Sequence, residues 1–157
     1  MSKVEVINPF IGLSKYPEWK SRWSDQDGLN IYSYISYTCD PEDVLVMSRL
    51  FFPDFVCVDG CVFLDFKYSP GMVGLLSSYS DMEKMDVEMS VNRFSLYDAF
   101  FGVGDKVDDL IYEQLCGVLV VSWGMALGKV FPGVEFKFES GNLESDYGPS
   151  LTFCKRR

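Results

Sequence analysis

The chain contains no histidine among its 157 residues. Histidine is the side chain whose unperturbed pKa lies nearest neutrality, and it is the most common general base and metal ligand in proteins. Its absence excludes Ser-His-Asp and Cys-His catalysis and the usual zinc sites. We therefore expect no enzymatic activity, no bound metal and no cofactor.

Targeting and membrane signals are also missing. No stretch reaches the roughly 18 consecutive apolar residues that a membrane span needs, and the longest apolar stretch, residues 115–127, is interrupted by Gly117, Ser122 and Gly124. The first residues lack the apolar segment of a signal peptide. The five cysteines are odd in number and irregularly spaced, which fits a reducing compartment. These features predict a cytoplasmic protein that does not enter a membrane.

Positive charge is scarce. The chain has 14 Lys and Arg against 23 Asp and Glu, a net charge of −9. A negative surface repels phosphate backbones and anionic membranes, so we expect no nucleic-acid partner. A basic protein partner is favoured, although net charge alone explains solubility equally well.

What the chain does have is material for a core. About 48% of residues are hydrophobic and 16% are aromatic, which predicts one folded domain over residues 1–157. Strands and helices alternate without a βαβ rhythm, so the predicted class is α+β with a mostly antiparallel sheet. The expected elements are a strand at 31–38, a helix from 41 to 51 or 52, a hairpin near 55–66, a long helix near 106–127, and strands at 134–139 and 149–154.

The hairpin is predicted from Asp59-Gly60 between β-forming residues. A two-residue loop pairs Val58 with Cys61 and places Cys57 on the other sheet face from Cys61. A three-residue loop would instead bring Cys57 and Cys61 opposite each other.

Several segments stay open at this stage. Residues 72–79 fit a β-segment or a short helix, and 81–92 fit a strand or an exposed helix. Helical spacing of apolar residues predicts a helix over 94–101, and a strand at 118–123 competes with the long helix. Residues 17–23 fit a short helix with Pro17 at its first position.

Trp19 and Trp23 would share one face of that short helix, and we expect both to pack onto the core.

Two acidic regions with interleaved tyrosines are candidates for a binding surface, residues 81–109 and 135–146. Aromatic anchors within a charged ring give interfaces both affinity and steering. The simpler interpretation is that these acids cap helices and are solvated, as we expect for Asp105 and Asp108. The candidate partner-binding residues are Asp81, Glu83, Asp86, Glu88, Tyr97, Asp109, Tyr112, Glu144, Asp146 and Tyr147.

In length, acidity, lack of a signal peptide and lack of a catalytic set, the chain resembles the small cytosolic immunity proteins of contact-dependent growth inhibition and related bacterial polymorphic toxin systems. The resemblance is one of overall profile and carries no individual residue across. The resemblance implies an inhibitor that binds a cognate toxin. Such toxins often act on nucleic acid, so the toxin surface that the inhibitor binds is often basic. Two alternatives remain: an enzyme that uses paired carboxylates without histidine, and a structural or adaptor subunit of an oligomer.

Overall fold

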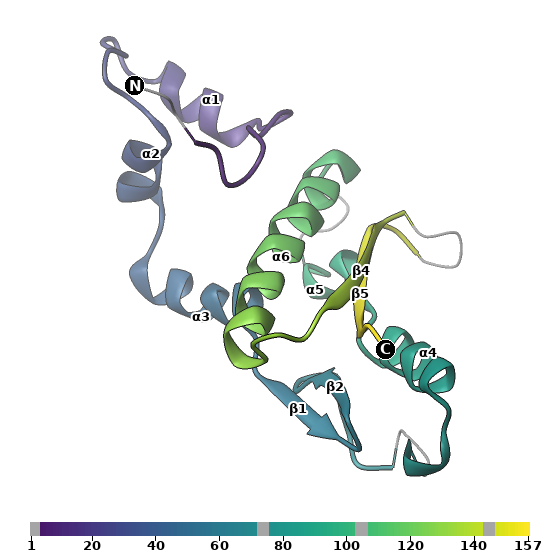
Figure 1. The fold of residues 1–157 in the computed structure, drawn as a ribbon. Helices are drawn as coiled ribbons and strands as arrows, with labels where there is room; N and C mark the ends of the chain where they lie inside the picture. Colours follow the sequence, from purple (N-terminus) through teal and green to yellow (C-terminus); the bar gives the residue numbers. More distant parts are fainter. Residues whose placement is uncertain (1–3, 72–75, 103–106, 143–146) are drawn as a thin grey trace.

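The structure is a computed structural model that describes residues 4–71, 76–102, 107–142 and 147–157 (Figure 1). Helices and short antiparallel strands are mixed along the chain, which confirms the α+β class. The elements are α1 (Lys15–Ser21), α2 (Ile31–Thr38), α3 (Pro41–Phe51), β1 (Phe55–Val58), β2 (Cys61–Leu64), the 3-10 helix η1 (Leu76–Ser78), α4 (Asp81–Val91), β3 (Phe94–Ser95), α5 (Leu96–Ala99), α6 (Asp109–Val130), β4 (Phe136–Gly141) and β5 (Ser150–Lys155).

The strands form two small antiparallel sheets. β1 and β2 make the predicted hairpin, and β5 lies between β3 and β4 in the second sheet. The hairpin turn has positive φ at both Asp59 (48°) and Gly60 (81°), which Asp-Gly tolerates. Val58 pairs with Cys61, so the two-residue loop is confirmed.

Helix α6 is the central element of the core. Asp108 begins it by accepting a hydrogen bond from the backbone N–H of Leu110 at 2.9 Å. The long helix is therefore confirmed, while the competing strand at 118–123 is wrong. Its buried residues form one stripe at helical spacing, and the stripe packs against β4 and β5. The buried residues are Tyr112, Cys116, Leu119, Ser122, Trp123 and Leu127.

Length and hydropathy alone would also allow α6 to cross a bilayer. Core helices of water-soluble proteins meet the same criterion. Here Leu119, Trp123 and Leu127 are fully buried within the protein itself, and the indole N–H of Trp123 donates to the Leu50 carbonyl at 2.8 Å. We therefore describe α6 as the core helix of this fold.

The remaining helices fall into two groups. Residues 4–52, which we call the arm, hold α1, α2 and α3 and extend along one side of residues 53–157, which we call the body (Figure 1). Within the arm as described, Trp19 is the only buried residue. Almost all of the buried core therefore belongs to the body.

Aromatic rings hold α1 against α2. Trp19 and Trp23 do share a face, with ring centroids 5.8 Å apart. They contact Tyr34 and Tyr37 of α2 (Trp19–Tyr34 5.5 Å, Trp23–Tyr37 5.1 Å), so the expectation that both pack onto the main core is wrong.

Helix α1 also begins earlier than predicted. Its N-cap is Ser14, and Pro17 is therefore the third helical residue rather than the first.

The predicted strand at Ile31–Thr38 is wrong, because this segment is helix α2. The Asn30 side chain accepts hydrogen bonds from the backbone N–H groups of Tyr32 (2.9 Å) and Ser33 (3.2 Å), and Ser33 Oγ accepts one from the Asn30 N–H. This reciprocal capping box satisfies the first turn of a helix. Local capping therefore overrides the β-propensity of the Ile- and Tyr-rich sequence.

Other elements follow the sequence more closely. Helix α3 covers the predicted segment, begun by Asp40 and Pro41. β4 and β5 are the predicted strands shifted by one or two residues. The segment at 81–92 is helical, and residues 76–78 form η1, while 72–75 lie outside the described residues. The helix expected over 94–101 is wrong in part, because Phe94 and Ser95 pair with β5 and only Leu96–Ala99 is helical.

Candidate interaction surface

The structure brings four of the ten predicted residues together. Tyr97 lies at the start of α5, and its hydroxyl donates a hydrogen bond to Asp109 in the first turn of α6. The Tyr97 ring makes edge-to-face contacts with Tyr112 (centroids 5.3 Å apart) and with Tyr147 (5.4 Å). We call Tyr97, Asp109, Tyr112 and Tyr147 the tyrosine cluster.

Tyr147 is the exposed member of this cluster. It is 84% exposed although its ring rests on Tyr97. The next residue, Gly148, has φ +85°, and a Cβ there would lie 2.4 Å from the Tyr97 ring. The Pro149 carbonyl then accepts a hydrogen bond from the Leu96 N–H at 3.0 Å. Glycine thus lets the backbone pass directly over Tyr97, which supports the Tyr147 ring from below.

Asp109 raises the pKa of the Tyr97 hydroxyl, to which it is hydrogen-bonded. Its hydrogen bond raises the pKa of Tyr97 to about 12, because the phenol is bound more tightly as a neutral donor beside a carboxylate. Tyr97 therefore remains a protonated donor near neutral pH, and exposed Asp109 presents its carboxylate beside the aromatic rings.

Tyr112 does not fit the predicted role of an exposed anchor. It is 2% exposed and packs between Tyr97 and Phe100 as the inner wall of the cluster. Its hydroxyl is buried and has no hydrogen-bond partner among the described residues. The prediction that Tyr112 contacts a partner directly is therefore wrong, because α6 turns this face into the core.

The acids of α4 divide between surface and interior. Asp81, Glu83 and Asp86 are exposed, as predicted. Glu83 also caps α4, because its carboxylate accepts from the Ser80 N–H at 2.7 Å while the Ser80 hydroxyl accepts from the Glu83 N–H. These hydrogen bonds lower the pKa of Glu83. These carboxylates come from a different helix than the tyrosine cluster.

Glu88 is the clearest error among the predicted surface residues, because it is fully buried. Oε1 accepts from the Val62 N–H at 2.7 Å, and Oε2 accepts from the Lys155 N–H at 3.1 Å and from Arg157 Nη1 at 2.6 Å. Arg157 also donates to the Gly60 carbonyl at 3.1 Å. Glu88 thus joins α4 to the hairpin and to the end of β5, and it is unavailable to a partner.

Asn92, one turn further along α4, extends this buried network. Its side chain accepts from the Leu64 N–H at 2.8 Å and donates to the carbonyls of Val62 (2.9 Å) and Phe153 (3.1 Å). Sequence reasoning missed both roles. The signal for Glu88 would have been the basic residues that follow the apolar β5, since a cation beside a buried strand requires a counter-charge.

The last two predicted residues, Glu144 and Asp146, lie outside the described residues. Asp105, expected to cap the long helix, lies outside them as well, whereas Asp108 does cap α6. The structure therefore places exposed Asp109 and Tyr147 beside half-buried Tyr97, and separately places an acidic face at Asp81, Glu83 and Asp86.

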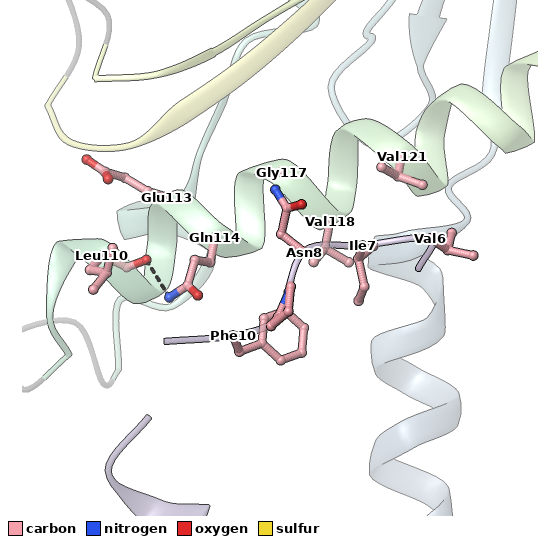
Figure 2. A pocket seen from close by; sticks show the side chains of 11 residues that line it. Val6, Ile7, Asn8, Phe10, Leu110, Glu113, Gln114, Gly117, Val118 and Val121 are labelled. Atoms are coloured by element: carbon pink, nitrogen blue, oxygen red, sulfur yellow. Dashed lines mark hydrogen bonds between the residues drawn. The ribbon is translucent and has the colours of Figure 1, made fainter. Parts of the chain in front are cut away.

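A second feature lies between the arm and α6, where the packing is loose. One cavity of about 380 Å³ separates residues 6–10 from α6, and Figure 2 shows the extended chain from Val6 to Phe10 beside the helix. Gln114 bridges the two segments, accepting from the Ile11 N–H at 2.7 Å and donating to the Ile11 carbonyl at 2.9 Å.

Two more cavities continue this seam. One of about 520 Å³ lies between Tyr34 and Ile111, and one of about 220 Å³ lies between Phe51 and Leu115. The arm therefore rests on α6 with incomplete apolar contact.

No group of three or more Cys, Asp and Glu side chains with metal-binding geometry occurs in the part of the chain that the structure describes. All five cysteines are free, with Cys39 and Cys57 exposed and the other three buried. No protein-family model, no curated protein and no solved structure matches this chain, so the description of the site rests on its own geometry.

Proposed function

We propose that this protein acts by binding another protein: it is an immunity-type inhibitor that neutralises a basic, nuclease-type toxin domain. The observation that carries the proposal is the tyrosine cluster, in which an exposed aromatic ring is held on a fixed support beside an exposed carboxylate. Such a ring loses little conformational entropy on binding, so most of its contact energy contributes to affinity.

Charge supports the same proposal. The net charge of −9 attracts a cationic partner over several ångströms, and the exposed carboxylates of α4 add to that field. Asp109 lies where a Lys or Arg side chain stacked on Tyr147 would find its counter-charge. The cluster therefore combines an aromatic anchor with local complementarity to a basic surface.

The carboxylate-enzyme alternative gains nothing from Glu88. A buried acid is a candidate general acid when its environment leaves it free to exchange a proton. Here two backbone N–H groups and the Arg157 guanidinium occupy its oxygens. Its contacts account for it as a structural ion pair.

The test first searches the genes next to that of this chain for a toxin with a basic nuclease domain, and then produces that domain as a catalytically inactive variant. The wild-type protein is expected to bind it, with an association rate that falls about tenfold or more as salt screens the charges. Tyr147→Ala is expected to raise the Kd by roughly 30-fold, as for a central aromatic anchor.

Tyr32→Ala is the matched control, because Tyr32 is 76% exposed but lies on α2 in the arm. It should leave the Kd within about twofold. Equal effects of the two substitutions would show that the tyrosine cluster is not the contact. Failure of the wild-type protein either to bind the toxin domain or to protect cells that produce it would overturn the proposed function.

A further inference from the structure

Helices α2 and α3 contain no buried residue, although both are rich in apolar side chains. In the first two turns of α3, Val44, Leu45, Val46 and Met47 are consecutive and all exposed. Four consecutive helical residues point in directions that nearly encircle the helix axis. A short helix gains most of its stability from packing of its apolar side chains, so α3 gains stability from a surface that covers part of this exposed set.

The body does not supply that cover. The C-terminal end of α3 contacts the body, where Leu50 and Phe51 pack against the core cluster and Arg49 pairs with Asp54. The seam between the arm and α6 already contains three cavities. The outer side of α2 and α3, seen along one edge of the molecule in Figure 1, is therefore free for another chain.

The charge pattern indicates what covers it. Residues 30–39 carry no charged side chain in a chain whose net charge is −9. A cationic partner gains nothing from a neutral patch. Two like-charged copies, by contrast, repel each other least where the surface is neutral.

Helix α3 is also complementary to itself. Its first turn carries Glu42 and Asp43, and its last turn carries Arg49. When two copies of α3 cross antiparallel at Leu45 and Val46, Glu42 of each copy lies opposite Arg49 of the other. A two-fold axis produces this arrangement, since residue i then faces residue j and j faces i.

We propose that two copies of this chain associate through an antiparallel contact between their α3 helices, flanked by the uncharged surface of α2. This interface is separate from the tyrosine cluster. It gives the protein a homodimeric form that is independent of the proposed toxin binding.

The exposed apolar area of α2 and α3, when a partner covers all of it, falls within the range that stable dimers bury. If a fully exposed large side chain offers about 150 Å², the exposed apolar and aromatic residues of α2 and α3 offer roughly 700 Å² per copy. Stable interfaces of standard size bury about 800 Å² per partner. The side chains counted are Ile31, Tyr32, Ile35, Tyr37, Val44, Leu45, Val46 and Met47.

Sedimentation velocity over a range of protein concentrations tests the proposal. The wild-type protein is expected to be a dimer at micromolar concentration. Salt should change the dimer Kd little, because it screens the repulsion between the two net charges as well as the attraction of the Glu42–Arg49 pairs. Leu45→Glu should raise the dimer Kd at least about 100-fold, because the substitution enters the interface twice.

Met82→Glu is the matched control, since Met82 on α4 is 69% exposed and Leu45 is 70% exposed. It adds the same charge at a distant site and should leave the dimer Kd within about threefold. A wild-type protein that is monomeric at every concentration overturns the proposal, and so do equal effects of the two substitutions.

A charge exchange tests the antiparallel pairing itself. Glu42→Lys and Arg49→Glu should each weaken the dimer about tenfold, and the double variant should restore it, because the exchanged pair is again complementary. Arg49 also forms an exposed pair with Asp54 at 3.1 Å, whose loss has little effect on folding. Absence of restoration overturns the pairing.

Binding of the wild-type protein to phosphatidylcholine vesicles, abolished by Leu45→Glu, would assign the surface to lipid and overturn the proposal. Toxin binding, by contrast, weakens steeply with salt and depends on a different residue, Tyr147. The failure of either proposal is therefore distinguishable from the failure of the other.

Discussion

The arm and the body use the same kinds of residue with different results. The body buries its apolar side chains on α6 and the sheets and crosslinks its elements through Glu88 and Asn92. The arm contains two tryptophans, four tyrosines and four isoleucines, yet only Trp19 becomes buried. Hydrophobic composition therefore does not by itself make a core, because a core also requires an opposing face at the right distance.

The largest expected difference between the two regions is in the strength of an ion pair. Glu88→Gln removes the charge that faces Arg157 in the body interior and should lower the free energy of unfolding by about 3–5 kcal/mol. Glu18→Gln makes the same substitution in an exposed pair with Arg22 in the arm and should cost about 0.5 kcal/mol or less.

Urea unfolding followed by tryptophan fluorescence, at one fixed protein concentration, measures both values. Comparable losses for the two variants would show that burial does not separate the body from the arm.

Thiol reactivity provides a second comparison. Burial raises the pKa of Cys116 to about 11 and also raises the pKa values of Cys61 and Cys154 in the body. A less acidic and inaccessible thiol reacts slowly with disulfide reagents. We expect Ellman's reagent to label exposed Cys39 and Cys57 quickly, and to label the other three at least about 100-fold more slowly until the protein unfolds. Fast labelling of a third thiol in the native protein would contradict the packing of the body.

The smallest expected effect lies at the surface of the body, in the tyrosine cluster. Removing the carboxylate with Asp109→Asn should return the pKa of Tyr97 from about 12 toward 10, as measured by the ¹³Cζ shift of labelled tyrosine. The folded-state pKa is the raised one, so the stabilising hydrogen bond is complete below pH 10 and is lost as the pH rises through about 12.

Asp86→Asn, at an exposed site on α4, is the control and should leave the Tyr97 shift unchanged. A Tyr97 pKa that stays near 12 in the Asp109 variant would rule out this carboxylate as its cause.

Elements with a complete local signal were predictable from the sequence. Asp40-Pro41 predicts the start of α3, and Asp59-Gly60 predicts the hairpin turn. The apolar periodicity of α6 predicts which face of this helix is buried. Each of these signals lies within a few residues of the element that it determines. Reading them requires no knowledge of the rest of the fold.

The sequence-based predictions are wrong where a weak local propensity is overridden by a stronger interaction, either with a neighbouring residue or with one far away in the sequence. Residues 31–38 have β-forming side chains, but the capping box of Asn30 and Ser33 starts a helix. Glu88 looks like one more acid of α4, and its burial depends on Arg157, which is 69 residues away. Pairing over such a distance leaves no periodic trace in the sequence.

The sequence predicts only part of the candidate surface, because the contacts within this surface also join residues that are distant in the sequence. Tyr97, Asp109 and Tyr147 were named from the density of acids and rings, but their contact depends on α5, α6 and Gly148 meeting in space. The sequence also predicts Tyr112 as part of this surface. Its burial becomes clear only from the orientation of α6 in the fold, which directs Tyr112 toward the core.

The position of β5 between β3 and β4 has a consequence for biosynthesis. The central strand of this sheet leaves the ribosome after both of its neighbours. Until β5 emerges, the nascent chain holds β3 and β4 without the strand that joins them and α6 without part of its cover, so the body cannot complete its fold before β5 has been synthesised. During that interval the unpaired strand edges are open to other chains, which gives molecular chaperones their clearest opportunity to act.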